Sequence, residues 1–336
     1  MQGGGRVLSI QSHTVQGYVG NKAAVFPLQL LGFDVDPINS VQFSNHTGYP
    51  TWKGQILDGE QLWALIEGLE ANGLLFYTHL LTGYIGSLSF LETVLRVVEK
   101  LRSVNPDLIY VCDPVMGDDG RLYIRPELVP IYRHKVVPVA TLITPNQFEA
   151  EQLTGLSIRT QADAITACDM LHAAGPTKVV ITSMEVDGRL VVVGSDASCN
   201  DLDESGSKSP ALKRFCIAVP KIPKYFTGTG DLMTALLLGW SHKFPRDLAR
   251  AAELAIASLQ AVLARTLDDY SLSPIETSFS SNSMRLELKL VQSRDDIINP
   301  PVVLRAQEIA SGADTLPDGV DTLLGSRVDS FGNTSK

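Results

Sequence analysis

Short runs of apolar, β-forming residues recur along this chain, and each of them stops at a polar cluster. The clearest are Leu108 to Cys112 before Asp113-Pro114, Ala140 to Ile143 before Thr144-Pro145-Asn146, and Lys178 to Ile181 before Thr182-Ser183. Continuous apolar runs, unlike alternating ones, are typical of strands that are buried on both faces. They predict an α/β fold, in which a central, mostly parallel sheet has helices on both faces.

Helical spacing of apolar residues separates these runs. It is found in Asn21 to Leu31, Asp58 to Glu70 and Phe90 to Leu101, whereas Arg6 to Ile10, Val35 to Phe43 and Leu74 to Leu81 are strand-like. Ligands of open α/β sheets bind outside the carboxyl ends of the strands. We therefore expect the functional site where the polar clusters follow the strands. Ser195 to Ser209 and Ser271 to Ser283 are rich in small polar residues and are expected to form exposed loops.

Composition limits the class of protein. The chain has 336 residues, 44% of them hydrophobic, and a net charge of −9, which argues against nucleic acid or an anionic membrane as a partner. Its four cysteines have no paired spacing, and no signal peptide or membrane-spanning run is visible, so a reduced, cytoplasmic compartment is expected. Residues 1–307 are expected to form one domain, and residues 308–336 a polar, disordered tail.

A glycine-rich turn precedes an almost wholly apolar segment. Gly228-Thr229-Gly230-Asp231 leads into Leu232 to Trp240. Backbone N–H groups at the start of a buried helix can hold an anion, and glycine lets a phosphate approach the backbone closely. Asp231 would stand beside that anion as a base. The turn therefore suits transfer of a phosphoryl group to a hydroxyl.

An ordinary helix cap is the alternative interpretation of this turn. Thr229, Gly230 and Asp231 are all of types that are common where helices begin. One such residue is enough for a cap, whereas four small or hydroxylated positions precede Asp231, so the phosphoryl interpretation is favoured. No Gly-Lys-Ser/Thr follows the turn, which disfavours a P-loop mechanism.

Acidic and amide side chains follow two of the predicted strands. Asp113, Asp118 and Asp119 follow one of them, where carboxylates could orient magnesium near a triphosphate. A solvated acidic turn is the alternative, and it is preferred for Asp119. Asn146 and Glu149 follow the next strand and could hold a nucleotide, or could form a capping box at the start of a helix. Their spacing leaves both interpretations open.

Polar residues also end the first two predicted strands. They are Ser12, His13, Ser44, Asn45, His46 and Thr47, and together they could hydrogen-bond a small polar substrate. Tyr84 could stack on a flat ring, although a partly buried aromatic is the commoner role for such a residue.

The chain resembles the pyridoxal kinases of the ribokinase-like superfamily from about Arg6 to Val303. The motifs that carry the resemblance are Arg6-Val7-Leu8-Ser9-Ile10-Gln11-Ser12-His13, Gly17-Tyr18-Val19-Gly20-Asn21, Asn39 to Tyr49, Leu81-Thr82-Gly83-Tyr84, Val111 to Val115, Ile143 to Glu151 and Gly228 to Asp231. Thr-Pro-Asn and Gly-X-Gly-Asp are shared by many sugar and vitamin kinases, whereas Ser-Asn-His-Thr-Gly-Tyr and Gln-Ser-His are specific to this family.

The resemblance implies an activity and its central residues. The activity is ATP-dependent phosphorylation of the 5′-hydroxymethyl group of pyridoxal, pyridoxine or pyridoxamine. Asp231 would take the hydroxyl proton, and the amides of Gly228, Thr229 and Gly230 would stabilise charge on the transferred phosphoryl group.

The resemblance also implies the residues that bind each ligand. Ser12 and Thr47 would hydrogen-bond the pyridine ring, with Val19, Phe43 and Tyr84 as its apolar walls. The nucleotide and magnesium region would comprise Asp113, Asp118, Asn146, Glu149, Thr182, Ser183 and Thr229, with Ile222, Pro223 and Lys224 beside the adenine. A monovalent cation, K⁺ or Na⁺, would bind at Asp113, Thr144 and Thr182. The family's usual assembly is a homodimer. Thr227 departs from the pattern, because animal members carry valine there.

Three other functions share some of these sequence features. A kinase for another hydroxymethyl compound, such as hydroxymethylpyrimidine, would have the same Gly-X-Gly-Asp motif. A non-catalytic vitamer-binding relative is disfavoured because Asp231 and its glycines are intact. A nucleotide-linked dehydrogenase would need Gly-X-Gly-X-X-Gly after the first strand, and Ser9 to Gly20 contains no such run.

Overall fold

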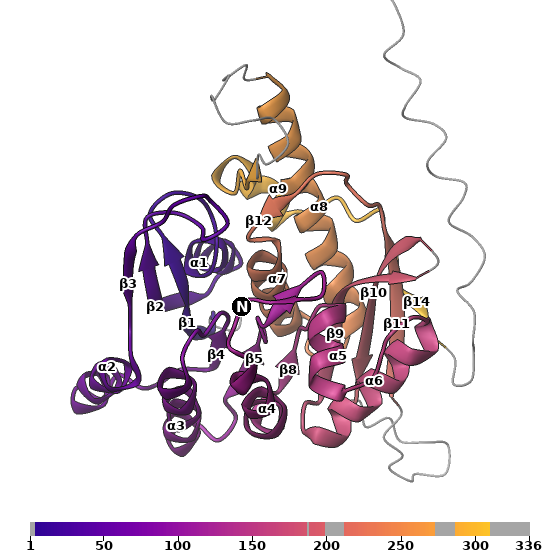
Figure 1. Cartoon of the computed structure of the whole chain (residues 1–336). Helices are drawn as coiled ribbons and strands as arrows, with labels where there is room; N and C mark the ends of the chain where they lie inside the picture. The colour runs from indigo at the N-terminus through magenta and orange to yellow at the C-terminus, as the bar shows by residue number, and fades with distance from the viewer. Residues whose placement is uncertain (1–3, 187, 199–211, 273–285, 310–336) are drawn as a thin grey trace, which may run out of the picture.

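The computed structural model describes residues 4–186, 188–198, 212–272 and 286–309. Ten strands of this part form one sheet (Figure 1), namely β1 (Arg6–Thr14), β2 (Asp34–Phe43), β3 (Gly54–Ile56), β4 (His79–Thr82), β5 (Ile109–Cys112), β8 (Leu142–Ile143), β9 (Lys178–Val186), β10 (Arg189–Asp196), β11 (Lys213–Val219) and β14 (Gln307–Glu308). Their order is β14-β11-β10-β9-β8-β5-β4-β1-β2-β3. All neighbours from β9 to β2 are parallel, and the outer pairs are antiparallel.

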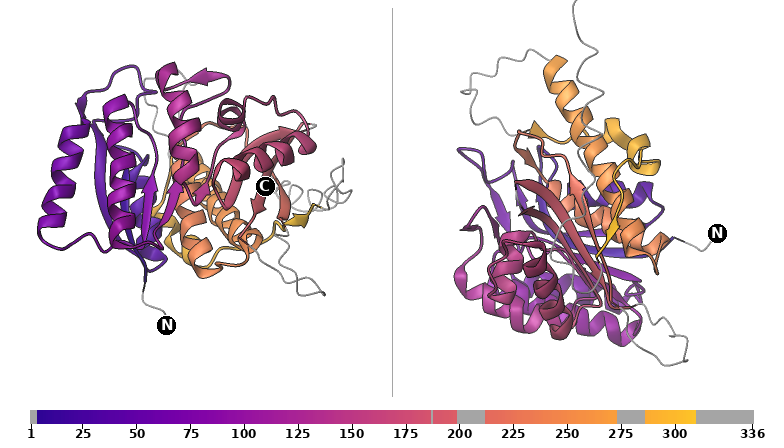
Figure 2. Two further views of the ribbon diagram at one scale, coloured as in Figure 1. Left: turned by 90° about the horizontal axis from the view of Figure 1, so that it is seen from below. Right: turned by 90° about the vertical axis from the view of Figure 1, so that its right-hand side faces the viewer.

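Helices cover both faces of the sheet (Figure 2). One face carries α1 (Asn21–Leu30), α7 (Thr229–Lys243), α8 (Leu248–Leu272) and α9 (Arg294–Ile298). The other face carries α2 (Gly59–Ala71), α3 (Leu88–Val104), α4 (Val129–Ile131), α5 (Gln147–Thr154) and α6 (Gln161–Ala174). Short turns η1 (Pro126–Leu128), η2 (Tyr132–Val136) and η3 (Val137–Val139) flank α4, and η4 (Val291–Ser293) precedes α9. The predicted fold class is confirmed.

Two small sheets lie at the carboxyl ends of the parallel strands. β6 (Gly117–Asp118) pairs antiparallel with β7 (Arg121–Leu122). β12 (Phe226–Thr227) pairs parallel with β13 (Leu286–Glu287). The second pair brings two segments that are 60 residues apart in the sequence to the start of α7.

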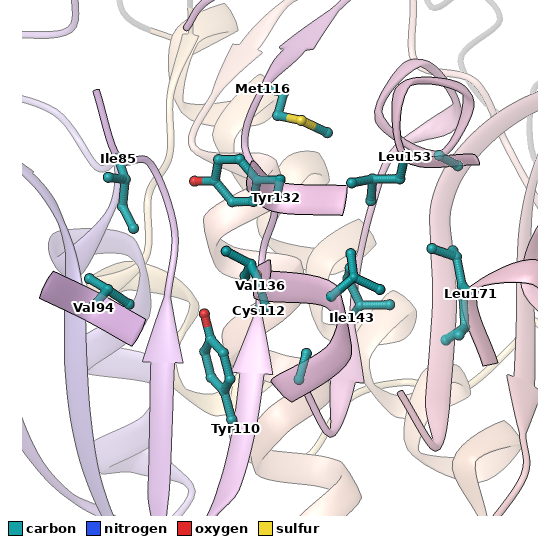
Figure 3. Packing of buried hydrophobic residues seen from close by; sticks show 14 of the residues in the cluster. Ile85, Val94, Tyr110, Cys112, Met116, Tyr132, Val136, Ile143, Leu153 and Leu171 are labelled. Carbon is teal, nitrogen blue, oxygen red and sulfur yellow. The ribbon is translucent and has the colours of Figure 1, made fainter. Parts of the chain in front are cut away.

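The sheet separates two hydrophobic cores. Figure 3 shows part of the core beside α3, α4 and α5, where Tyr110, Cys112 and Tyr132 are fully buried. The Tyr110 hydroxyl is satisfied by Thr82 Oγ1 at 2.9 Å. Each fully buried large apolar side chain contributes about 1.5–3 kcal/mol to stability. This double packing fixes the strand ends rigidly, which is what a site built on those ends requires.

Several strands have different bounds from those predicted. β1 continues to Thr14 and β9 to Val186, so Ser12 and Thr182 lie within strands and do not follow them. Ser195 was expected in a loop, but it lies in β10 and is fully buried. Ser12 and Ser195 gain backbone partners by pairing with neighbouring strands, and the Thr182 amide donates to the Pro145 carbonyl, which overrides their turn preference. The strand predicted from Leu74 begins only at His79.

Ser271, where the second loop was expected to begin, lies in α8, which continues to Leu272. Most of the remaining loop predictions fall on residues 199–211, 273–285 and 310–336, which lie outside the described residues, as does Asp187. β14 includes Glu308, one residue beyond the expected domain boundary, and Ile309 is buried. Helices in the described ranges are all too short or too polar to cross a membrane.

Candidate active site

A cavity of about 750 Å³ lies at the carboxyl ends of the parallel strands. The start of α7 and β12 form one wall of this cavity. Most of the predicted site residues line the cavity, namely Ser12, Val19, Phe43, Thr47, Tyr84, Asp113, Asp118, Thr144, Asn146, Glu149, Thr182, Ser183, Ile222, Lys224, Gly228, Thr229, Gly230 and Asp231. Pro223 is exposed and is not among the lining residues. The structure therefore brings nearly all of the predicted residues into one cavity.

The glycine turn starts α7 at the cavity and leaves its first amides without a side-chain cap. Gly228 is the N-cap residue, with φ +79°, and it makes no side-chain cap. A Cβ on Gly228 would lie 1.9 Å from the Tyr18 carbonyl oxygen, so this position needs glycine. A Cβ on Gly230 would meet only Asp113 Oδ2, at 3.8 Å. The turn is therefore no ordinary side-chain cap, and it presents the N–H groups and helix dipole that an anion site requires.

Two acidic residues lie at this turn, namely Asp231 within it and Asp113 beside Gly230. Burial raises the pKa of Asp231, opposed by a hydrogen bond from the Gly20 backbone. Asp113 is 5% exposed, and burial raises its pKa well above the usual range, with the charges of Glu149 and Asp231 adding to the effect. Gathered negative charge of this kind favours a bound cation, which would lower those pKa values again.

A chain of hydroxyls connects the strand ends to α7. Thr234 Oγ1 donates to Asp113 Oδ2 at 3.2 Å and lies 2.9 Å from Thr144 Oγ1. The sequence analysis did not identify Thr234. It follows Gly230 by four residues and so shares the same face of the helix, which is the signal that could have revealed it.

Asn146 and Glu149 form a capping box at the start of α5. Asn146 Oδ1 accepts the Glu149 amide at 2.8 Å, and Glu149 Oε2 accepts the Asn146 amide at 2.9 Å. Glu149 Oε1 also accepts the Met116 amide at 2.9 Å. Burial raises the pKa of Glu149 to about 7, although these backbone donors oppose the shift. The capping interpretation is therefore confirmed, and both residues also line the cavity.

The acidic segment after β5 forms a tight hairpin over the cavity. Asp119 and Gly120 have φ values of +48° and +75°, the combination that a type I′ turn requires. Both Asp118 and Asp119 are exposed, but only Asp118 is among the lining residues of the cavity. The preference for a solvated turn at Asp119 is consistent with this position.

Strands β1 and β2 form the opposite wall. Ser12 pairs with Val41 and Thr14 with Phe43, and all four side chains line the cavity because alternate residues share a face. His13, between them, is not part of the lining. Ser44 and Asn45 also lie outside the lining and brace their own loop, since Ser44 Oγ accepts the Lys53 amide and Asn45 Nδ2 donates to the Thr51 carbonyl.

Several lining residues were missed by the sequence analysis. Four lie on one face of α8, namely Ile256, Leu259, Gln260 and Leu263. Their spacing of three and four residues was visible, but in a long apolar helix it predicts only a core-facing stripe. Thr14 also lines the cavity but was not predicted as a site residue, because its strand was expected to end before it. Its hydroxyl is buried and has no hydrogen-bond partner among the described residues.

Comparison with known proteins identifies the family. The family model described as phosphomethylpyrimidine kinase matches residues 79–267. A pyridoxal kinase of Arabidopsis thaliana is 65% identical over 303 residues, which cover 90% of this chain and 94% of that protein. The chain belongs to the pyridoxal kinase family. The pyridoxal kinase of Homo sapiens is 46% identical over 310 residues, covering 90% of this chain and 97% of that protein.

Solved pyridoxal kinases share the fold. The enzyme from Leishmania donovani in complex with ADP and pyridoxamine has a TM-score of 0.80 at 38% identity, covering 91% of this chain and 99% of that one. The enzyme from Trypanosoma brucei has a TM-score of 0.77 at 35% identity, covering 92% and 100%. The family resemblance identified from the motifs is therefore confirmed.

Proposed function

We propose that this chain transfers the terminal phosphoryl group of ATP to the 5′-hydroxymethyl group of pyridoxal, pyridoxine or pyridoxamine. The observation that carries the proposal is the position of Asp231, which lines one cavity together with the uncapped amides of the turn before it. Membership of the pyridoxal kinase family and the likeness to a complex with ADP and pyridoxamine support the choice of substrates.

In the proposed reaction, Asp231 accepts the hydroxyl proton while the oxygen attacks the terminal phosphorus of ATP, and the bond from that phosphorus to ADP breaks. A pKa raised by burial makes this carboxylate a stronger base once it is ionised. The amides of Gly228, Thr229 and Gly230 stabilise the charge that gathers on the transferred group. Positioning and electrostatics supply most of the catalysis in phosphoryl transfer, and this turn offers both.

In this proposal, the vitamer lies in the cavity against the wall formed by β1 and β2. Ser12 and Thr47 hydrogen-bond the pyridine ring, and Val19, Phe43 and Tyr84 enclose its faces. All five line the cavity, and Val19 and Phe43 are buried apolar side chains, which suits an aromatic ring.

The nucleotide occupies the opposite half. Asn146, Thr182, Ser183 and Thr229 contact its phosphates, and Ile222 and Lys224 border the adenine. Pro223 was expected there too, but its exposed position makes it a weaker candidate.

The carboxylates of this half fit a divalent cation. Asp118 and Glu149 would hold Mg²⁺, directly or through water, and the ion would neutralise phosphate charge. Among the described residues no three acidic, His or Cys side chains form a ready-made metal cluster. That is compatible with Mg²⁺, which keeps waters and binds phosphate oxygens together with one or two carboxylates.

A monovalent cation, K⁺ or Na⁺, would bind at Asp113, Thr144 and Thr182. The buried carboxyl of Asp113 and the hydroxyl of Thr144, which both contact the Thr234 hydroxyl, are suitable oxygen ligands. We also propose a cytoplasmic homodimer, from the resemblance and from the absence of paired cysteine spacing in the sequence.

Replacing the base tests the proposal. Asp231→Asn keeps the size of the side chain but cannot accept the proton, so turnover should fall roughly 100- to 10,000-fold. The measurement is phosphate incorporation from ATP into each vitamer, with hydroxymethylpyrimidine as a competing acceptor because of the matched family model. Asp119→Asn, at an exposed carboxylate outside the lining, is the matched control and should keep wild-type turnover.

Two results would contradict the proposal. Wild-type turnover in Asp231→Asn would remove Asp231 from the role of base. Faster turnover of hydroxymethylpyrimidine than of every vitamer would assign the enzyme to the other acceptor.

A further inference from the structure

A buried carboxylate lies behind the vitamer wall, outside the cavity lining. Glu287, in β13, is 6% exposed. Its two oxygens accept three hydrogen bonds from neutral donors: the Thr227 hydroxyl at 2.8 Å, the Tyr49 hydroxyl at 3.0 Å and the Tyr18 amide at 3.2 Å. A buried carboxylate is costly unless it is hydrogen-bonded, and bonds to such a group are stronger than neutral ones. The three hydrogen bonds therefore fix the positions of their donors relative to Glu287.

The three donors come from three separate segments of the chain that border the cavity. Tyr18 precedes Val19, Tyr49 follows Thr47, and Thr227 itself lines the cavity. These donors stand 269, 238 and 60 residues from Glu287 in the sequence. One carboxylate thus holds together segments that no local structure would keep in register.

The loop between β1 and α1 is fitted closely around this carboxylate. A Cβ on Gly17 would lie 2.4 Å from Glu287 Oε2, and Gly17 has φ +89°, so only glycine suits this approach. The same loop contacts the catalytic turn, because the Tyr18 carbonyl packs against Gly228. Its Gly20 backbone hydrogen-bonds the carboxylate of Asp231.

We propose that Glu287 is a positioning residue for the vitamer half of the active site. It acts through Tyr18, Tyr49 and Thr227, holding the loops that enclose the ring and orient Asp231, and it does not itself contact substrate. The inference rests on the proposed function, which assigns this wall to the vitamer. The nucleotide half has separate supports, among them the capping box of Asn146 and Glu149. Loss of the Glu287 carboxylate should therefore disturb one substrate and spare the other.

The test is Glu287→Gln in the full-length enzyme. The amide keeps the shape of the side chain but replaces one acceptor oxygen with an NH₂ group. This group would face the hydrogen-bond donors that now bind the carboxylate. We expect kcat/KM for pyridoxal to fall about tenfold or more, with a raised KM for pyridoxal, while the KM for ATP changes by less than about twofold. Unfolding temperature is measured in parallel.

The control is a second buried carboxylate that also accepts three hydrogen bonds, two of them from arginines. Glu253, in α8, is 8% exposed and accepts hydrogen bonds from Arg250, Arg305 and the Ala306 amide. It lies outside the cavity lining. Glu253→Gln should lower the unfolding temperature and leave both KM values near wild type. A purely structural Glu287 would behave in the same way.

A milder substitution guards against misfolding of Glu287→Gln. Tyr49→Phe removes one hydroxyl and should raise the KM for pyridoxal selectively. Because both act through one carboxylate, the double variant should be little worse than Glu287→Gln alone.

Two outcomes would overturn the role of Glu287. In the first, the KM values for pyridoxal and ATP rise equally, or neither changes. In the second, Tyr49→Phe leaves the KM for pyridoxal unchanged. Failure of the proposed function looks different, because then the wild-type chain itself would phosphorylate no vitamer.

Discussion

At the scale of residues, the two glycines of the turn before Asp231 have different reasons to be glycine. Gly228 has a left-handed backbone and no room for a Cβ beside the Tyr18 carbonyl. Gly230 has an ordinary backbone and room for a Cβ, because only Asp113 lies within 4 Å. The fold therefore requires the first glycine, and in the proposed mechanism the incoming phosphate requires the second.

Substituting each glycine by alanine should separate these reasons. Gly228→Ala should lower the unfolding temperature, since a left-handed non-glycine residue alone costs about 1–2 kcal/mol. Gly230→Ala should keep or raise the unfolding temperature, as alanine favours a helix by about 0.5–1 kcal/mol, yet lose about tenfold or more in kcat/KM because its methyl group enters the anion site. Thermal unfolding and steady-state kinetics give both values. Full activity in Gly230→Ala would argue against an anion held at these amides.

At the scale of elements, three aromatic rings join β4 to the end of α7. His79 begins β4, at the end away from the cavity, and its ring lies 5.1 Å from that of His242 and 5.4 Å from that of Phe33. His79 is 2% exposed. Burial, and then the charge of His242, lowers the pKa of His79 to about 4. The folded protein therefore keeps this imidazole neutral.

Burial of His79 in this contact should make the free energy of unfolding depend on pH. Between pH 6.5 and about 4, the unfolded chain binds a proton at His79 that the folded chain does not, so stability falls as pH falls through this window. The difference between a pKa of 6.5 and one of about 4 corresponds to about 3 kcal/mol at the lower limit. Urea unfolding of wild type and His79→Phe at several pH values measures this difference. Equal slopes in the two proteins would refute the assignment to His79.

At the scale of the whole molecule, the described chain closes with a short edge strand. β14 pairs with β11 through Gln307 and Glu308, and the Ile309 amide donates to the Arg214 carbonyl at 2.9 Å. Ile309 is 7% exposed and belongs to the core beside α3 to α6. The folded domain therefore includes these residues.

Truncation should locate the end of the domain. A chain ending at Ile309 should keep the unfolding temperature and turnover of the full chain, because composition predicts only a polar tail beyond it. A chain ending at Ala306 keeps the contacts to Glu253 but loses β14 and Ile309, so it should unfold at a lower temperature. Thermal unfolding of the three chains decides this. A lower unfolding temperature in the chain that ends at Ile309 would show that the tail contributes to the fold.

The sequence by itself determined the fold class and most of the residues that line the candidate site. Apolar runs that stop at polar clusters are a local pattern, and the geometry of parallel strands brings their carboxyl ends to one edge, so Asp113, Thr144 and Thr182 could be placed together without coordinates. The glycine turn before Asp231 could likewise be recognised from adjacent residues alone. A left-handed residue and the open amides after it depend on a few neighbouring residues.

Only the tertiary structure decided the contacts that join distant segments. Whether Ser12 lies in β1 or after it depended on pairing with β2, which local preference does not encode. Glu287 could not be recognised from its surroundings in the sequence, because its partners at Tyr18 and Tyr49 are more than 230 residues away. Turn and strand signals come from short-range sterics, whereas the partners of a buried polar group are chosen by the packing of the whole chain.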